Sequence, residues 1–243
     1  MISEDKAKEK LYYLAKNVNV ELNDKQLKMF MKYYNLLIEK NKVMNLTAIT
    51  DLEEVVIKHF VDSLSIAKFV DMTKEMNVID VGSGAGFPGI PLKIAFPNIN
   101  LVMLDSLGKR VNFLNDTTIR LDLTNVEAIH ARAEDGAKVN GMRQNFDLCV
   151  SRAVANLATL SEYCLPFVKE GGMFVCYKSG NIDVELKESN KAITTLSSEV
   201  AGIDKFVLPE TDIERTLIKI SVKGKIDKKY PRKSGIPSRD PIK

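Results

Sequence analysis

The chain contains 243 residues, of which 45% are hydrophobic and 28% are charged, proportions typical of a globular protein with one large domain plus additions. No apolar stretch approaches the roughly 18–20 residues of a membrane-spanning helix, and no apolar core follows the charged N-terminus, so we expect a cytoplasmic protein without a signal peptide or membrane contact. The formal net charge is only +3, which by itself indicates no particular partner.

Residues 4–70 have the patterns of helices. Asn23 and Gln26 have the spacing of a capping box, and Asp51 and Glu54 predict a second helix start of the same kind. After the first of these starts, apolar residues repeat at helical spacing: Leu27, Phe30, Met31, Tyr34, Leu37 and Ile38. We therefore predict a small N-terminal helical subdomain over residues 1–70.

From residue 77 onwards the pattern changes to alternating strands and helices. The predicted strands are 77–81, 100–105, 125–129, 145–151, 172–178, 203–208 and 215–222, and the predicted helices are 89–96, 107–121, 131–138, 156–168 and 182–200. This alternation predicts an α/β domain over residues 71–222, with a seven-stranded, mostly parallel sheet and helices on both faces. The last two strands have no helix between them, so we expect an antiparallel pair at one edge.

A glycine-rich loop follows the first predicted strand. The strand ends at Asp80 and Val81, and glycines then recur at Gly82, Gly84, Gly86 and Gly89. Such a loop between a strand and a helix lets a ligand lie against bare main chain, which favours a nucleotide-like cofactor. Gly84 to Gly89 also satisfies the G-x-G-x-x-G pattern of dinucleotide-binding dehydrogenases, which keeps that class as an alternative.

Two residues of this loop count against a dinucleotide. The carboxylate of Asp80 would repel a pyrophosphate, and Pro88 removes a backbone amide that would bind one. An acid here suits a cationic sulfonium cofactor with an α-amino group. The D-x-G-x-G-x-G pattern is typical of S-adenosylmethionine-dependent methyltransferases.

Further polar residues occur at the ends of the following strands. Asp105 ends the second strand and is placed to bind both ribose hydroxyls, although it could instead cap the helix that follows. Ala133, Glu134 and Asp135 follow the third strand, and either Glu134 or Asp135, with the backbone amides at Ala133 and Glu134, would face the adenine. Arg152 ends the fourth and would hold the cofactor carboxylate or the target base, with a structural ion pair as the alternative.

Several longer motifs resemble those of the small-subunit (16S) ribosomal RNA guanine-N7 methyltransferases of type G, also called glucose-inhibited division protein B. The resemblance runs in order from about residue 41 to 241. The matching segments are Asn45-Leu46-Thr47, Lys58-His59-Phe60-Val61-Asp62-Ser63, the loop from Asp80 to Leu92, Gly108-Lys109-Arg110-Val111, Ser151-Arg152-Ala153-Val154-Ala155 and the stretch from Lys229 to Pro237.

The resemblance implies a Rossmann-like class I methyltransferase fold, with S-adenosylmethionine as the cofactor. It also implies methylation of N7 of one guanine in the 530 loop of 16S rRNA. The family's cofactor contacts fall on Gly82, Phe87, Ala133, Glu134 and Arg152, to which the residue patterns above add Asp80, Gly84 and Asp105. Because N7 carries a lone pair and no proton, we expect no general base and no metal. Among these residues only Arg152 is a catalytic candidate, for positioning.

We interpret His59 as a core histidine hydrogen-bonded to Asp62 rather than as a base. Lys109 and Arg110 are equally compatible with a solvated helix face and with RNA contact. Cys149, Cys164 and Cys176 form no Cys-x-x-Cys pair, so we expect buried, reduced thiols.

The C-terminal residues 223–243 form a basic tail. They include eight basic and two acidic side chains, a net charge of +6, which leaves 27 basic and 30 acidic side chains and a net charge of −3 in residues 1–222. We predict contact with 16S rRNA or the small ribosomal subunit by this tail. The residues chosen for this contact are Lys228, Lys229, Arg232 and Lys233.

We expect a monomer. Two further alternatives remain open at this point: a methyltransferase for a small molecule or a protein, and a non-catalytic RNA-binding or ribosome-assembly factor. The basic tail argues against the first, and failure to bind S-adenosylmethionine would favour the second.

Overall fold

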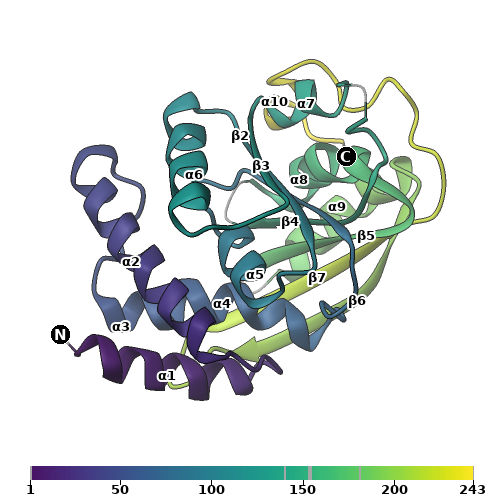
Figure 1. Ribbon diagram of the computed structural model, residues 1–243. Helices are drawn as coiled ribbons and strands as arrows, with labels where there is room; N and C mark the ends of the chain where they lie inside the picture. Colours follow the sequence, from purple (N-terminus) through teal and green to yellow (C-terminus); the bar gives the residue numbers. More distant parts are fainter. Residues whose placement is uncertain (1, 140, 153–154, 181, 243) are drawn as a thin grey trace.

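The computed structural model describes residues 2–139, 141–152, 155–180 and 182–242 (Figure 1). The N-terminal helices begin as the sequence predicts. The side chain of Asn23 accepts from the backbone N–H of Gln26, whose own side chain accepts from the N–H of Asn23, a complete capping box. Asp51 caps the next helix through the N–H groups of Glu53 and Glu54. The elements of this region are α1 (Glu4–Lys16), α2 (Asp24–Met44), α3 (Leu52–Val55), a π-helical turn (Val56–Val61), α4 (Asp62–Leu64) and a 3₁₀ turn (Ser65–Lys68).

The seven strands form one sheet in the order β3-β2-β1-β4-β5-β7-β6. The first five in the chain pair in parallel, and β7 pairs antiparallel with both β5 and β6. This confirms the predicted mostly parallel sheet with an antiparallel edge. The strands are β1 (Asn77–Val81), β2 (Asn100–Asp105), β3 (Val126–His130), β4 (Phe146–Arg152), β5 (Val168–Ser179), β6 (Ser198–Val207) and β7 (Glu214–Val222).

Helices cover both faces of the sheet. They are α5 (Gly89–Ala95), α6 (Gly108–Arg120), α7 (Ala133–Gly136), α8 (Leu157–Cys164), continued by a 3₁₀ turn (Leu165–Phe167), α9 (Asp183–Thr195) and, near the C-terminus, α10 (Ile236–Arg239). The prediction of one helix over 182–200 was wrong at its end. Ser197 adopts a positive φ of 52°, and Ser198 begins β6, whose backbone pairs with β7. A strand partner distant in sequence decided this boundary.

Alternate strand residues point to opposite faces and build two hydrophobic cores. Val78 and Leu148 pack in one core with α1, α2 and α5, whereas their neighbours Ile79 and Cys149 pack in the other with α8 and α9. The N-terminal helices therefore share a core with the sheet. The division into 1–70, 71–222 and 223–243 stays a prediction.

All three cysteines are buried and free, as predicted. Cys149 and Cys176 lie in the neighbouring strands β4 and β5, and Cys164 ends α8. Burial raises the pKa of the thiols of Cys164 and Cys176. Within the described ranges, no helix is long and apolar enough to cross a membrane.

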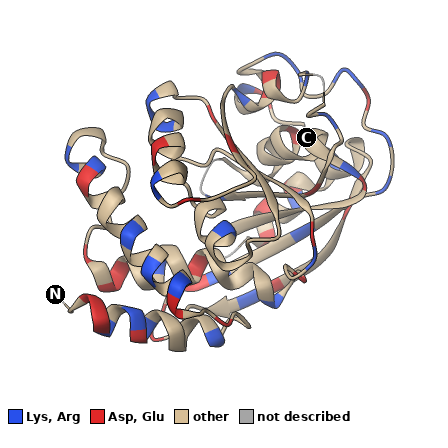
Figure 2. Cartoon of the chain, in the orientation of Figure 1, with Lys and Arg blue, Asp and Glu red and all other residues tan. Residues whose placement is uncertain are grey.

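The C-terminal segment, residues 223–242, lies along the body of the protein as the yellow trace of Figure 1, and Figure 2 shows basic residues along it. Arg143 donates from its guanidinium to the carbonyl oxygens of Ile226, Asp227 and Tyr230, at 2.9, 3.0 and 2.7 Å. The hydroxyl of Thr159 donates to the carbonyl oxygen of Pro237 at 3.0 Å. The segment is docked against the protein body by its backbone, so its conformation depends on residues far away in the sequence.

Candidate active site

A cavity of about 520 Å³ opens at the carboxyl ends of β1, β2 and β4. This is the place where open α/β sheets bind ligands. Seven of the eight predicted cofactor residues line it: Gly82, Gly84, Phe87, Asp105, Ala133, Glu134 and Arg152. The sheet order thus brings together side chains from the ends of separate strands, as the sequence predicts.

The glycine loop is held from two sides. The carboxylate of Asp105 accepts from the N–H of Gly84 through Oδ2 and from the N–H of Leu107 through Oδ1, both at 2.9 Å. From α2, the hydroxyl of Tyr33 donates to the carbonyl oxygen of Ala85 at 2.6 Å. Gly84 has a φ of 60°, a conformation that glycine adopts without strain. Asp105 therefore fixes the loop and the start of α6 while its side chain lines the cavity.

Asp80 lies beneath the loop instead of in the cavity wall. Its side chain is fully buried, and Oδ2 accepts from the N–H of Gly89 at 3.0 Å. Among the described residues, Oδ1 has no hydrogen-bond partner. Burial raises the pKa of this carboxyl to about 7. Asp80 therefore anchors the start of α5.

The opposite wall of the cavity is built by α7 and the C-terminal segment. Oε1 of the buried Glu134 accepts from the backbone N–H of Gly235 at 2.9 Å. Gly235 and Ser238 themselves line the cavity, as does Tyr163 from α8. The predicted tail thus supplies part of the wall.

Arg232 is held by an ion pair with a buried carboxylate. Its guanidinium donates to both carboxylate oxygens of Glu162, at 2.7 to 3.1 Å, and to the carbonyl oxygen of Asp240 at 2.7 Å. The side chain of Glu162 is completely buried. Arg232 is therefore engaged in anchoring the segment, whereas Lys228, Lys229 and Lys233 are exposed. The RNA contact of these four residues stays a prediction.

At the β4 end of the cavity, aromatic and cationic groups meet on Phe87. The imidazole of His59 stacks on this ring with 4.4 Å between centroids, and the guanidinium of Arg152 lies 5.0 Å from the ring centroid. Nε2 of His59 is 2.8 Å from the hydroxyl of Thr47, which also lines the cavity. Burial, with a contribution from Arg152, lowers the pKa of His59 to about 3, so the imidazole is neutral.

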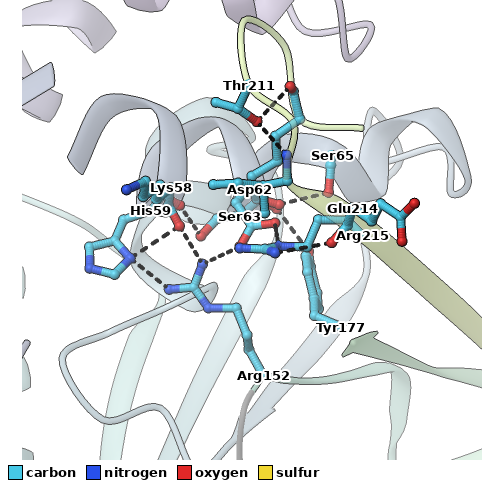
Figure 3. A network of polar contacts seen from close by, with 12 residues as sticks. Lys58, His59, Asp62, Ser63, Ser65, Arg152, Tyr177, Thr211, Glu214 and Arg215 are labelled. Atoms are coloured by element: carbon cyan, nitrogen blue, oxygen red, sulfur yellow. Dashed lines mark hydrogen bonds and ion pairs between the residues drawn. The ribbon is translucent and has the colours of Figure 1, made fainter. Parts of the chain in front are cut away.

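The predicted bond between His59 and Asp62 was wrong. Oδ2 of the buried Asp62 accepts from Nη1 of Arg152 at 2.9 Å, and its Oδ1 accepts from Nε of Arg215 at 3.0 Å (Figure 3). Nδ1 of His59 instead lies 3.2 Å from the carbonyl oxygen of Lys58 and 3.4 Å from Nη2 of Arg152. Two guanidiniums compete better than a neutral imidazole for a buried carboxylate. Arg152 is thus a member of an ion pair and a cavity residue at once.

The profile of one protein family, described as rRNA small subunit methyltransferase G, matches residues 26–216. A relative of that name from Lachnoclostridium phytofermentans is 49% identical over 227 residues, which are 93% of this chain and 94% of the relative. Another, from Staphylococcus carnosus, is 47% identical over 225 residues, 92% of this chain and 94% of the relative. The chain belongs to this family.

Solved structures confirm the fold of the enzyme. A ribosomal protein L11 methylase from Lactobacillus delbrueckii subsp. bulgaricus has a TM-score of 0.50 and 20% identity, with 69% of this chain and 79% of that one covered. The Methanococcus jannaschii fibrillarin pre-rRNA processing protein has a TM-score of 0.50 and 15% identity, with coverage of 65% and 71%. The resemblance drawn from the sequence is confirmed, as is the Rossmann-like architecture.

The enzyme is an S-adenosylmethionine-dependent rRNA methyltransferase. The cavity fits this cofactor in its chemistry. The carboxylates of Asp105 and Glu134 suit hydroxyl and amino groups, the ring of Phe87 suits a sulfonium, and the guanidinium of Arg152 suits a carboxylate. The S-adenosylmethionine prediction is confirmed by the family, whereas the contacts of individual residues stay predictions.

Several residues of the methyltransferase cavity received no role from the sequence. Leu46 and Thr47 belong to the Asn45-Leu46-Thr47 motif, so the motif was the available signal. Gly235 lies in the matching C-terminal stretch, and Ser238 follows that stretch directly. The fold is what brings both residues to the cavity. Arg110 also lines the cavity, and its Nη1 lies 3.7 Å from Oδ2 of Asp105, whereas Lys109 is exposed. Ala153 and Val154 of the quoted motif lie outside the described residues.

Proposed function

We propose that this methyltransferase acts on N7 of a guanine in the 530 loop of 16S rRNA, by direct attack of N7 on the sulfonium methyl group. The observation that carries the proposal is the family match over residues 26–216. The neutral state of His59, the one imidazole among the described cavity-lining residues, agrees with it. Its pKa of about 3 makes it a poor proton acceptor. Guanine N7 has an in-plane lone pair and no proton to remove, so its methylation needs no general base.

The cofactor's nucleoside would lie against the β2 and α7 side of the cavity. Asp105 would accept from the ribose hydroxyls, and the backbone at Ala133, with Glu134, would face the adenine. Gly82 and Gly84 would allow close approach of the main chain. Asp80 would support the loop from below. With the nucleoside in this position, the methionine end of the cofactor would point towards Phe87 and Arg152.

The residues at the β4 end would bind and align the reacting groups. Bound S-adenosylmethionine supplies the methyl group. The guanidinium of Arg152 would hold the cofactor carboxylate, and the ring of Phe87 would lie near the sulfonium. Alignment of donor and acceptor is worth up to about 7–11 kcal/mol in favourable cases, and fixed dipoles would stabilise the charge that moves onto the purine. The guanine must be exposed or flipped to reach the site.

The RNA would contact the outer side of the C-terminal segment through Lys228, Lys229 and Lys233. These side chains are exposed, and the same segment lines the cavity at Gly235. Phosphate contacts there would place the target near the cavity mouth. We propose that the enzyme works as a monomer in the cytoplasm, on naked 16S rRNA or on the assembling small subunit.

The test is transfer of a labelled methyl group from S-adenosylmethionine to 16S rRNA and to small subunits from a strain that lacks the enzyme. We expect label in a single guanine of the 530 loop, identified as 7-methylguanine after nuclease digestion. Fully modified subunits from the parent strain are the matched control and should accept no label. Label at another base, or at a guanine atom other than N7, would overturn the proposal.

A further inference from the structure

A buried carboxylate behind the cavity holds two guanidiniums. Asp62, from α4, is 2% exposed and binds Arg152 from β4 and Arg215 from β7 (Figure 3). Each oxygen of the carboxylate accepts from one of the two arginines, which fixes its rotation. Arg152 lines the cavity, whereas Asp62 and Arg215 do not. Among the described residues, the side chains of Asp62 and Arg215 therefore reach the cavity through Arg152, and the backbone N–H of Asp62 also donates to the carbonyl oxygen of His59.

The contacts of Arg152 leave one edge of its guanidinium free. Nη1 donates to Asp62 and, at 3.4 Å, to the carbonyl oxygen of Lys58, while Nη2 lies 3.4 Å from Nδ1 of His59. In the part of the chain that the structure describes, Nε of Arg152 has no hydrogen-bond partner. Nε and the second N–H of Nη2 form a fork that matches a carboxylate. The occupied edge thus determines where the free edge points.

The charges of this cluster are unequal. Asp62 contributes one negative charge, and Arg152 and Arg215 contribute two positive charges. The other groups that contact Arg152 are uncharged: a backbone carbonyl, the neutral imidazole of His59 and the ring of Phe87. Asp80 also interacts electrostatically with Arg152, but burial raises its pKa to about 7, so this carboxyl is only partly ionised near neutral pH. A buried cluster with one positive charge in excess favours an anion at its open side. That side is the cavity.

We propose that Asp62 and Arg215 are positioning residues, which set the guanidinium of Arg152 to receive the carboxylate of the cofactor. The inference rests on the proposed contact between Arg152 and that carboxylate. Arg215 restrains the carboxylate of Asp62, and Asp62 in turn restrains Arg152. The N-terminal helical region and strand β7 thereby contribute to cofactor selectivity without contacting the cofactor.

The test compares two ligands that differ at the group in question. S-adenosylhomocysteine carries the amino-acid carboxylate, and 5′-methylthioadenosine has the same nucleoside thioether without it. Calorimetric titration of Asp62→Asn should show roughly 10- to 100-fold weaker binding of S-adenosylhomocysteine, the effect of one charge-assisted hydrogen bond. Binding of 5′-methylthioadenosine should change less than about twofold, because its contacts do not involve Arg152. Equal weakening of both ligands, or of neither, would overturn the proposal.

Tyr177→Phe is the matched control, because the Tyr177 hydroxyl donates to the carbonyl oxygen of Ser63 at 2.8 Å, next to Asp62. Tyr177 lies opposite Arg152 in the β4–β5 pair, but within the described ranges its hydroxyl makes no hydrogen bond to the Arg152 side chain. This variant should leave the ratio of the two affinities unchanged. If Asp62→Asn does not fold, Arg215→Met serves instead. We expect this variant to lose less affinity for S-adenosylhomocysteine than Asp62→Asn would, with the affinity for 5′-methylthioadenosine again unchanged. The titrations contain no RNA, so their outcome is independent of whether the 16S guanine is the target.

Discussion

Glu134 and Gly235 are 101 positions apart in the sequence, yet a 2.9 Å hydrogen bond joins the Glu134 carboxylate to the Gly235 backbone N–H. Both residues line the cavity. The wall on the α7 side is therefore assembled from two distant parts of the chain. Its geometry depends on a buried carboxylate that the sequence suggested only as an adenine contact.

Glu134→Ala should weaken binding of S-adenosylhomocysteine by roughly 10- to 100-fold, since the variant loses a charge-assisted hydrogen bond and loosens the wall. Calorimetric titration measures the affinity. The neighbouring Asp135→Ala is the control, because Asp135 is exposed and does not line the cavity. Identical affinities for the two variants would contradict the role of Glu134.

Arg232→Ala should lower the free energy of unfolding by about 3–5 kcal/mol, because the buried carboxylate of Glu162 loses its charged partner and keeps only the backbone N–H of residue 232 as a donor. Urea unfolding monitored by circular dichroism measures the change. Lys233→Ala removes the adjacent, exposed cation and should cost less than about 0.5 kcal/mol. A similar, small loss in the free energy of unfolding for both variants would mean that the ion pair with Glu162 contributes little. Arg232 would then again be a candidate for RNA contact.

Replacing Lys228, Lys229 and Lys233 together by Gln should weaken RNA binding and flatten its salt dependence. Each lost phosphate contact lowers the slope of log K against log salt by roughly 0.7–0.9. Filter binding over a series of salt concentrations gives this slope. A matched triple variant of Lys6, Lys8 and Lys16 on α1, which lies across the molecule from the C-terminal segment in Figure 1, should keep the wild-type slope. An unchanged slope for the variant of Lys228, Lys229 and Lys233 would mean that these lysines are solvated and do not contact the RNA.

His59→Gln should reduce the loss of stability in acid. The folded pKa of His59 is about 3 against an ordinary value of 6.5, so the unfolded chain binds the extra proton between these values and wild-type stability falls as pH falls from about 6.5. The lowered pKa of His59 accounts for a loss of up to about 2 kcal/mol in the free energy of unfolding of the wild type between pH 8 and pH 5. The loss is about 1.4 kcal/mol for each pH unit below 6.5.

Urea unfolding at pH 8 and pH 5 measures this difference. The raised pKa of Asp80 acts in the opposite direction, because its folded form is protonated below about 7, but this contribution is present in both proteins and cancels in the comparison. Equal losses in wild type and variant would show that His59 is protonated in the folded protein.

Gly86→Ala should destabilise the protein more than Gly84→Ala. Both glycines have positive φ, so both variants carry a backbone penalty of roughly 1–2 kcal/mol. A Cβ at Gly86 would lie 2.5 Å from Cδ1 of Ile90 and 2.9 Å from the hydroxyl of Tyr33, whereas at Gly84 its nearest neighbour is 3.9 Å away. The overpacking should add about 1–3 kcal/mol for Gly86 alone, measured by thermal or urea unfolding. Equal destabilisation of the two variants would mean that Tyr33 of α2 and Ile90 of α5 move aside to accommodate the added methyl group.

The strand ends were predictable because parallel strands carry their ligand residues at one edge of the sheet. Asp105 and Arg152 reach one cavity for this reason, since each lies at the end of a strand that the sequence predicted. The π-helical turn that carries His59 was not predictable, since its pattern reads as an ordinary helix. His59 was consequently given the wrong partner.

Long-range pairing explains the other differences. The charge of Arg232 suggested an RNA contact, and no local pattern indicates that Glu162, 70 positions earlier, is buried against it. The same holds for Arg215 and Asp62, which are 153 positions apart. Charge composition predicts the character of a surface, whereas the choice of ion-pair partners depends on the tertiary fold.

The burial of Cys149, Cys164 and Cys176 gives the protein an internal reporter of unfolding. All three thiols are fully buried, and they sit in β4, α8 and β5, between the sheet and its helices. An alkylating reagent therefore reaches them only when this core opens, and the extent of labelling follows the equilibrium population of the opened state. Mass spectrometry of pulse-labelled protein would then rank the variants above by stability in dilute solution, without denaturant and without an added probe.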